Sequence, residues 1–514
     1  MKLSVFSQKA SGIGQAVKMP NRIVDGTKQQ QDIWTELSSG NQDHVVIEAR
    51  AGCGKSSTCR EAMWKILDEH KSRQIRYAVF SRANADEFRL DCPTGVEVAT
   101  LHSFGLSALR THFGSHPEKM KTYVILDSFT VAKNLPRYMR RSISHLVAQA
   151  KSQMLKPDQE DLPEILSRLM ILYDINGYGR EKLIIDLSMD VLEQSAKWVE
   201  VADFDDMIWL PVLHDVSFPH LDFFFVDECQ DLNPAQQALL RLAKKNSRVI
   251  CVGDRYQAIY AFRGADSDSI PNLERMLSEE GLRQFPLNVT FRCPKRHVRL
   301  AQHYVDDIRA HESAPDGEVE EGWSLENAYL RYRPGDFVIC PTNAPVIQQA
   351  LKLIAMNVPV IVRGRAVGDS LASIVRSLGR VATTAQLASG VEKWRNRELL
   401  RLSDLDDAEE LQDQVNDRAN GLMAVIQACS SPAEVEPAIA RLFTDEADFS
   451  KVVFSTVHRA KGLEADTVWY LDLPQRSPKR EWETRQQKNL RYVALTRSKH
   501  RLCFVEPEEE QKGE

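Results

Sequence analysis

The stretch FFFVDECQD, residues 223–231, places two carboxylates directly after an apolar run. Such a run is typical of a strand that is buried on both faces of a parallel sheet. Asp227 and Glu228 would then lie at the carboxyl edge of that strand, where open α/β sheets bind their ligands. We therefore expect an α/β fold with a functional site at this edge.

A second stretch, ARAGCGKS at residues 49–56, follows another apolar run at residues 45–47. Its Gly52 and Gly54 fit the end of a phosphate-binding P-loop, although Ala49 stands where the pattern begins with glycine. Glycines let backbone N–H groups turn toward phosphate oxygens, and the N-terminus of the following helix adds a favourable dipole. An ordinary strand–helix turn is the alternative for this stretch on its own.

The two stretches together predict a nucleotide-hydrolysis site that uses ATP and Mg²⁺. Lys55 would reach the β- and γ-phosphates, while Ser56 and Asp227 would hold the Mg²⁺ ion. Glu228 would orient or deprotonate the attacking water. An acid pair alone would more often cap the helix that follows it, but the P-loop reverses that preference. The residues that we expect to contact the nucleotide here are Ala51, Gly52, Cys53, Gly54, Lys55, Ser56 and Ser57.

Composition limits the class of protein. The 514 residues suffice for roughly three or four domains, and 43% hydrophobic with 27% charged residues is typical of a soluble globular chain. The net charge of −6 means that any contact with nucleic acid must use a local groove. We expect no membrane span, no signal peptide and a cytoplasmic location, nucleoid-associated in a prokaryotic or viral setting. The nine cysteines form no C-x-x-C pair, which fits reduced thiols rather than zinc or iron–sulfur ligands.

The order of strand-like and helical segments predicts two α/β cores, each split by a mostly helical insertion. The first core would comprise residues 1–109 and 202–284, with the first insertion at 110–201. The second core would comprise residues 285–368 and 450–514, with a short second insertion at 369–449 and an acidic tail. The strands that we expect from apolar runs lie at residues 44–48, 77–80, 96–99, 223–226, 248–252, 336–340, 358–362, 451–454 and 467–471.

Further motifs stand before and after the P-loop in a fixed order. They are TKQQQDI at 27–33, FSRANADE at 80–87, TLHSFG at 100–105, GDRYQAIYAFRGA at 253–265, FR at 291–292, TVHRAKGLE at 456–464 and YVALTR at 492–497. Together with DECQD, this set resembles the UvrD/Rep-type superfamily 1 DNA helicases over about residues 27–504. The resemblance implies two RecA-like P-loop NTPase cores and ATP-driven 3′→5′ movement. It implies single-stranded DNA and single/double-strand junctions as partners, possible replication or recombination proteins as further partners, and a monomer or weak oligomer.

The resemblance also implies roles around the nucleotide. Gln30 would read adenine, Phe291 would stack on it, and Glu464 would bind the ribose. Gln257 would sense the γ-phosphate and couple it to DNA. Arg292 and Arg497 would act from the second core as arginine fingers, an effect worth roughly 10³–10⁵ in rate in related NTPases. A surface ion pair is the alternative for Arg292 taken alone.

A DNA track is implied by the same motifs. Aromatic side chains would stack on bases, which contributes about 1–3 kcal/mol per base, although each aromatic taken alone is more often a core residue. Phe262 stands where the family usually has tryptophan, so its grip on DNA would be weaker. The residues that we expect to contact DNA are Phe80, Arg82, His102, Tyr260, Phe262, Arg263, Thr456 and His458.

Four functions remain open at this point. The first is a DNA helicase or single-strand translocase, and the second is a translocase that strips proteins such as recombinase filaments from DNA with little unwinding. A small-molecule P-loop kinase or other NTPase is the third, and the motifs after DECQD argue against it. A DNA-binding module with an inactive ATPase is the fourth, and Lys55, Glu228 and Arg497 argue against that.

Overall fold

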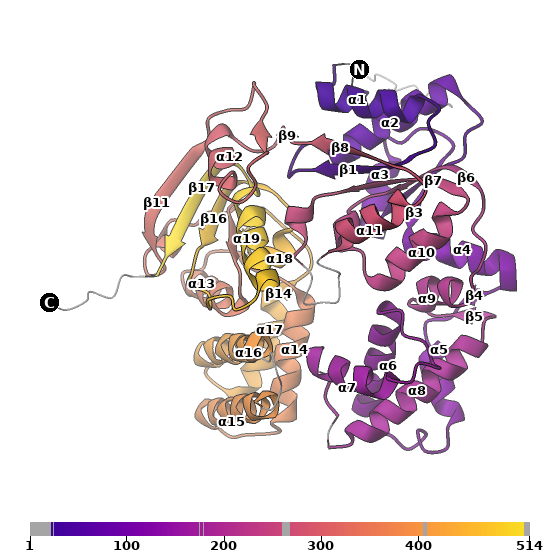
Figure 1. The fold of residues 1–514 in the computed structure, drawn as a ribbon. Coiled ribbons are helices and arrows are strands. Elements are labelled where there is room, and N and C mark those ends of the chain that lie inside the picture. Colours follow the sequence, from indigo (N-terminus) through magenta and orange to yellow (C-terminus); the bar gives the residue numbers. More distant parts are fainter. Residues whose placement is uncertain are drawn as a thin grey trace, which may run out of the picture.

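The structure is a computed structural model that describes residues 22–23, 25–173, 175–177, 179–259, 268–403 and 409–507. It contains two large parallel β-sheets with helices packed on them, and two groups of helices that lie on one side of the sheets (Figure 1). The predicted α/β class with parallel sheets is therefore confirmed. None of the helices in these ranges is long and apolar enough to cross a membrane.

The first sheet is parallel throughout, with the strand order β3–β2–β6–β7–β1–β8. Its strand β6 is the apolar run before Asp227, and residues 223–226 are at most 8% exposed. Phe224 packs on the face covered by α4, α9 and α10, whereas Phe225 packs on the face covered by α1 and α2. The elements are β1 (His44–Ala49), β2 (Ile75–Val79), β3 (Val96–Thr100), β6 (Leu221–Val226), β7 (Ser247–Gly253), β8 (Leu282–Leu287), α1 (Lys28–Ser38), α2 (Lys55–Glu69), α3 (Arg82–Arg89), α4 (Leu101–Phe113), α9 (Asp206–Leu213), α10 (Pro234–Lys244) and α11 (Ser269–Ser278).

The first helical group lies between β4 (His116–Pro117) and β5 (Val201–Ala202), which pair with each other. Buried ion pairs fasten it to α9: Lys121 Nζ lies 2.8 Å from Asp206 Oδ2, and Lys151 Nζ lies 2.9 Å from Asp203 Oδ2 and 2.7 Å from Asp206 Oδ1. Buried charges of this kind hold a unique geometry only when they are paired. The helices of this group are α5 (Lys121–Ser128), α6 (Arg137–Ser152), α7 (Leu162–Leu172) and α8 (Glu181–Lys197).

The second sheet is also parallel, with the order β11–β17–β16–β12–β15–β13–β14. Its strand β12 lies between β16 and β15 and is fully buried. The elements are β11 (Glu318–Ser324), β12 (Phe337–Cys340), β13 (Val360–Arg363), β14 (Phe443–Thr444), β15 (Val452–Thr456), β16 (Ala465–Leu471), β17 (Ser498–Glu506), α12 (Lys295–Ala301), α13 (Asn343–Ala355), α18 (Val457–Ala460) and α19 (Glu481–Leu495). Between the sheets, β9 (Val289–Thr290) pairs with β10 (Arg309–Ala310).

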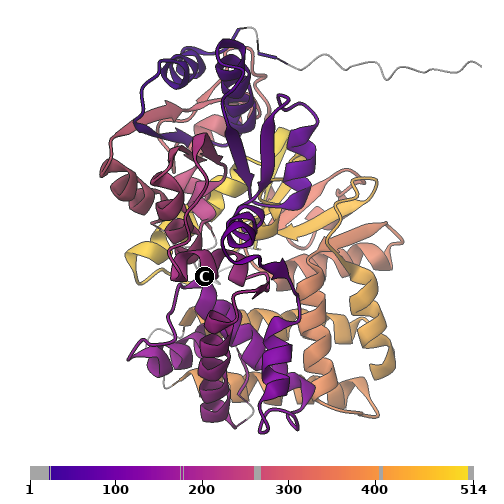
Figure 2. The ribbon, with the colours of Figure 1, turned by 90° about the vertical axis from the view of Figure 1, so that its right-hand side faces the viewer.

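The second helical group consists of α14 (Arg365–Ser377), α15 (Thr384–Leu402), α16 (Glu409–Gln427) and α17 (Pro432–Leu442). It shares one hydrophobic core with α13 and the second sheet. Figures 1 and 2 both show this group, in orange, beside the first helical group, in purple, and on the same side of the cores. The two groups also touch, because Arg401 Nη2 of α15 donates to the Ile175 carbonyl oxygen at 3.4 Å.

One predicted boundary is wrong. We expected the second core to begin at residue 285, but β8 runs from Leu282 to Leu287 and pairs with β1, so the first sheet includes residues 285–287. The edge strands β8 and β11, and β17 next to β11, were also absent from the expected strands. The sequences of β8 and β11, LRQFPL and EVEEGWS, are largely solvent-exposed and contain no apolar run. The other domain boundaries stay predictions.

Candidate active site

The P-loop connects β1 to α2 at the carboxyl edge of the first sheet. Gly52 and Gly54 have φ angles of +71° and +77°, a left-handed conformation that glycine adopts without strain. A Cβ at Gly52 would lie 2.5 Å from Arg292 Cβ, so glycine is also needed for close packing against the segment that follows β9. Helix α2 begins at Lys55, which directs its N-terminal dipole at the loop.

The acids after β6 meet the P-loop as the sequence predicts. Lys55 Nζ lies 2.8 Å from Glu228 Oε1, and Ser56 Oγ lies 3.4 Å from Asp227 Oδ2. The Tyr77 hydroxyl donates to the same Asp227 oxygen at 2.7 Å. Lys55, Ser56, Asp227 and Glu228 thus share one cluster, with Tyr77 fixing the orientation of the Asp227 carboxylate.

The surroundings of Asp227 and Glu228 shift their pKa values in opposite directions. Burial would raise the pKa of Glu228, but Lys55 and Lys461 more than offset it and lower that pKa to about 2. Burial and the neighbouring Glu228 raise the pKa of Asp227. Asp227 therefore holds a buried negative charge that lacks full compensation, a situation that a divalent cation relieves.

The arrangement fits Mg²⁺. The described ranges contain no cluster of three or more histidine, cysteine, aspartate or glutamate side chains that could hold a metal by themselves. Mg²⁺ in nucleotide sites takes one or two protein oxygens, and phosphate and water supply the rest. Ser56 and Asp227 are two such oxygens at the start of α2 and the end of β6.

Glu228 has a strained backbone. Its φ angle of +52° is unusual for a residue with a side chain and is of the kind found at functional sites. Gln230 fixes the carboxylate, because its Nε2 donates to Glu228 Oε2 at 2.6 Å. The Gln230 Oε1 atom accepts from the backbone N–H of Asp254 at 3.0 Å. Gln230, itself held by the backbone of Asp254, thus positions one oxygen of the predicted base, and Lys55 binds the other.

The predicted γ-phosphate sensor, Gln257, lies in the short 3₁₀ helix after β7. Its Nε2 donates to Asp254 Oδ2 at 2.7 Å, and the side chain is buried. Lys461, just after α18 of the second core, donates to the Gln257 carbonyl oxygen at 2.9 Å and forms an ion pair with Asp231. The second core therefore contacts both acid-bearing and sensor segments of the first.

The residues predicted to act from the second core do not all face the P-loop. Arg292 forms an ion pair with Glu464, which also pairs with Lys499 at 2.8 Å. The predicted finger and the predicted ribose ligand thus bind each other. Arg497 is 1% exposed, and its guanidinium donates to the Val493 and Leu463 carbonyl oxygens and to the Thr496 hydroxyl. Burial, with Arg292 nearby, lowers its pKa to about 10.

The two predicted adenine contacts lie beside the P-loop. A Cβ at Gly54 would be 3.7 Å from Gln30 Nε2 and 4.0 Å from the Phe291 ring. Phe291 is 49% exposed, and its backbone N–H donates to the Gly52 carbonyl oxygen at 2.9 Å. Gln30 is buried and also caps α1, since its Oε1 accepts from the Thr27 N–H and its Nε2 donates to Thr58 Oγ1, both at 2.9 Å.

The remaining P-loop predictions are placed as follows. Cys53 is buried, and its thiol donates to the Arg50 carbonyl oxygen at 2.6 Å. The backbone N–H of Ala51 donates to the Tyr492 hydroxyl at 2.8 Å. Ser57 is exposed on α2. Of these three, only Ala51 contacts the second core by a hydrogen bond.

Three of the predicted DNA contacts, Tyr260, Phe262 and Arg263, lie outside the described residues. Phe80 is 59% exposed directly after β2, and Arg82 is exposed at the start of α3. His102 is the second residue of α4, and burial lowers its pKa to about 4. Its ring stacks on Phe204 at a centroid distance of 3.9 Å.

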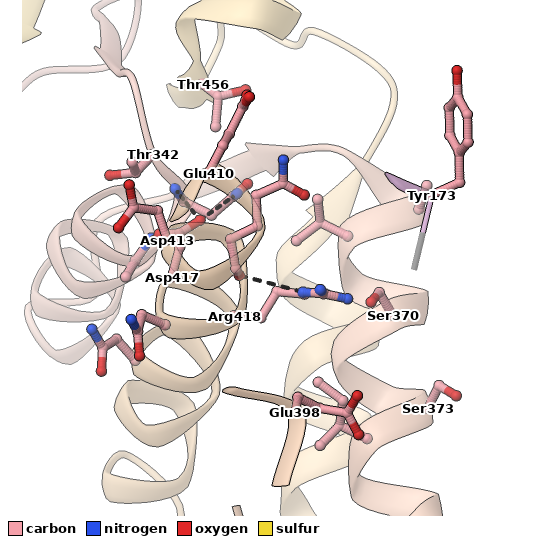
Figure 3. A pocket seen from close by; sticks show the side chains of 18 of the residues that line it. Tyr173, Thr342, Ser370, Ser373, Glu398, Glu410, Asp413, Asp417, Arg418 and Thr456 are labelled. Atoms are coloured by element: carbon pink, nitrogen blue, oxygen red, sulfur yellow. Dashed lines mark hydrogen bonds between the residues drawn. The ribbon is translucent and has the colours of Figure 1, made fainter. Parts of the chain in front are cut away.

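Thr456 and His458 line a groove of about 1790 Å³ between the two helical groups. Seven arginines and seven carboxylates line it, so it is not basic as a whole. Figure 3 shows Glu410, Asp413 and Asp417 together on α16, Glu398 apart from them, and Ser370 and Ser373 on the neighbouring α14. A DNA strand that entered this groove would need to lie along its arginines and avoid the acids of α16.

Sequence reasoning missed three residues. Phe204 is 61% exposed, and the acids around it gave no reliable signal of this, because Asp203 and Asp206 are buried. Lys461 lies in the motif TVHRAKGLE at 456–464, but no role was predicted for it from the sequence. The Tyr492 hydroxyl gave no signal, because its partners come from distant segments.

Comparison with known proteins agrees with this geometry. Residues 27–278 match the family model described as UvrD/REP helicase N-terminal domain, and residues 451–505 match the UvrD-like helicase C-terminal domain. The chain is 23% identical to F-box DNA helicase protein 1 of Schizosaccharomyces pombe, over 93% of this chain and 57% of that protein. It is 25% identical to F-box DNA helicase 1 of Gallus gallus, over 93% and 49%, and 28% identical to ATP-dependent DNA helicase PcrA of Bacillus subtilis, over 55% and 40%.

The chain spans about half the length of the curated relatives that it matches most fully. Both family models fall on the segments that build the site, since the first contains the P-loop and both acids and the second contains Lys461, Tyr492 and Arg497. The order of the motifs, the two parallel sheets and the matched models point the same way. The chain belongs to the UvrD/Rep-like helicase family.

Proposed function

We propose that this protein is an ATP-dependent DNA helicase or single-strand translocase that uses Mg²⁺ and moves 3′→5′ in DNA repair, recombination or replication. The observation that carries the proposal is the cluster of Lys55, Ser56, Asp227 and Glu228. Beside this cluster, Lys461 of the second core contacts Asp231 and the Gln257 carbonyl oxygen of the first. A hydrolysis site that is shared between two mobile bodies can convert each turnover into relative movement of those bodies.

The contacts suggest how hydrolysis would begin. Lys55 forms an ion pair with Glu228 at 2.8 Å. When phosphate oxygens take over Lys55, Glu228 loses the cation that contributes most to lowering its pKa, and its basicity rises. Glu228 would then be free to orient the attacking water, held in place by Gln230. The bound Mg²⁺ would neutralise charge that develops on the phosphates.

The second core would complete the site. Arg292 and Glu464 are paired, so a nucleotide that binds between the cores would separate them and direct Arg292 to phosphate and Glu464 to ribose. Arg497 carries a buried charge with only neutral oxygen partners, which a phosphoryl group would compensate. Binding energy thus favours closure of the cleft.

The test of this function is ATP turnover with and without single-stranded DNA, followed by strand separation of duplexes with a 3′ or a 5′ tail. We expect DNA to stimulate turnover and unwinding to require the 3′ tail. Equal or better unwinding from the 5′ tail would contradict the direction. Movement on single strands without strand separation would favour the alternative, a translocase that removes proteins from DNA.

Phe204 offers a test of the DNA track within the described chain. Phe204→Ala should weaken single-strand affinity by about 1–3 kcal/mol, because it removes an exposed ring that is already stacked on His102. Fluorescence anisotropy with labelled single strands measures this. Leu330→Ala removes another exposed apolar side chain, outside the groove, and should leave affinity unchanged. Equal affinity of both variants and the parent would exclude Phe204 from the track.

A further inference from the structure

Tyr492 of α19 joins the two cores through one hydroxyl group. The side chain is completely buried. Its hydroxyl accepts from the backbone N–H of Ala51 in the P-loop at 2.8 Å and donates to Asp254 Oδ2, after β7, at 3.2 Å. A single atom of the second core therefore bonds to two segments of the nucleotide site, and none of the roles above uses it.

Asp254 connects Tyr492 to Gln257, the predicted γ-phosphate sensor. The Oδ2 atom that accepts from Tyr492 also accepts from Gln257 Nε2 at 2.7 Å, and Oδ1 accepts from the Tyr256 N–H at 3.1 Å. Asp254 is fully buried, so each of its donors matters for holding the carboxylate in one orientation. Loss of the Tyr492 hydroxyl would free Oδ2 to rotate together with Gln257.

The same residue also leads to the predicted base. The Asp254 backbone N–H donates to Gln230 Oε1 at 3.0 Å, and Gln230 Nε2 donates to Glu228 Oε2 at 2.6 Å. A Cβ on Gly253 would lie 2.6 Å from that Gln230 oxygen, so glycine allows the close approach. Tyr492, Asp254, Gln230 and Glu228 thus form a continuous chain of polar contacts.

Helix α19 holds the hydroxyl in place from the second core. Asn489, nearly one turn earlier, donates from Nδ2 to the carbonyl oxygens of Arg255 and Ala258 at 3.3 and 2.9 Å. Arg497, the predicted finger, follows Tyr492 by five residues. Movement of α19 away from the first core would therefore withdraw the hydroxyl, Asn489 and the finger together.

We propose that Tyr492 is a positioning residue whose hydroxyl links closure of the second core to the orientation of Gln257 and Glu228. This inference rests on the proposed function, because it assigns a role in the hydrolysis step of that activity. It predicts that hydrolysis is fast only while the hydroxyl is bonded to both Ala51 and Asp254.

The experiment compares Tyr492→Phe with Tyr470→Phe. Tyr470 is a buried tyrosine of β16 in the same core, and its hydroxyl has no hydrogen-bond partner within the described ranges. Tyr492→Phe should lower kcat with DNA by roughly 10- to 100-fold, as expected for misplaced catalytic groups, while the Kd of a fluorescent ATP analogue stays close to that of the parent. Tyr470→Phe should keep the parental kcat and Kd.

Rates are taken per nucleotide-binding molecule, so partial unfolding does not enter kcat. A parental kcat for Tyr492→Phe, with or without a lower melting temperature, would overturn the proposal. A double-mutant cycle with Gln257→Ala adds a second criterion, because residues that act as a unit are not additive. Tyr492→Phe should cost little in the Gln257→Ala background, and full additivity would overturn the link to Gln257.

The two failures are distinguishable. If the parent hydrolyses ATP without any response to DNA, the proposed function fails. The basal kcat of Tyr492→Phe against that of the parent then still decides whether the hydroxyl positions the hydrolysis site.

Discussion

Glu228→Gln is expected to slow ATP hydrolysis by about 10²–10⁴-fold while ATP binding is retained, because an amide cannot accept the proton of the attacking water. The substitution keeps the side-chain shape beside Gln230. It also removes the negative charge that neutralises Lys55 in the nucleotide-free protein. The affinity for ATP should therefore stay equal to that of the parent or increase.

Two measurements check this prediction. Steady-state turnover gives the loss in kcat, and equilibrium binding of a fluorescent ATP analogue gives the affinity. Glu69→Gln is a suitable control, because Glu69 is an exposed glutamate at the far end of α2 from the P-loop. Parental turnover in Glu228→Gln would show that the acid after β6 is not the base.

The sequence predicted the interior of the fold better than its edges. The apolar runs at β1, β6, β12 and β15 correspond to strands that are buried on both faces, where composition alone reveals the structure. The strands β8 and β11 lie at the edges of their sheets and carry polar side chains toward solvent. Such strands have a weak apolar pattern, so the boundary at residue 285 was misplaced.

The sequence likewise predicted only part of the candidate site. Motif spacing predicted that Lys55 and Ser56 would meet Asp227 and Glu228, because the ends of parallel strands meet at one edge of a sheet. Motif spacing could not predict the contacts between the two cores. The ion pair of Lys461 with Asp231 depends on how two separate bodies pack together, and local sequence carries no record of that packing.

The second large effect is expected at Arg497. Arg497→Met should lower hydrolysis by roughly 10³–10⁵-fold, the contribution of an arginine finger in related NTPases. We expect little or no loss of thermal stability in the nucleotide-free protein. The charge of Arg497 is buried and bonded to neutral oxygens, and no ion pair of Arg497 is found in the part of the chain that the structure describes. Replacing such a buried charge by an apolar side chain of similar length is often neutral or stabilising.

The contrast between lost hydrolysis and retained thermal stability makes the test specific. Burial and the nearby Arg292 lower the pKa of Arg497 to about 10, so the folded protein holds this cation against an unfavourable environment. A phosphoryl group is the partner that would compensate it. A non-hydrolysable ATP analogue with Mg²⁺ should therefore raise the melting temperature of the parent more than that of Arg497→Met.

Arg501→Met is the matched control, because Arg501 lies on β17 of the same core, is partly exposed and has Glu320 as its carboxylate partner. It should keep parental turnover and the parental shift with nucleotide. A large fall in the melting temperature of Arg497→Met, with unchanged turnover per folded molecule, would show that Arg497 serves packing alone. Lost turnover at an unchanged melting temperature would instead show that the buried guanidinium is retained for hydrolysis, since the fold does not need its charge.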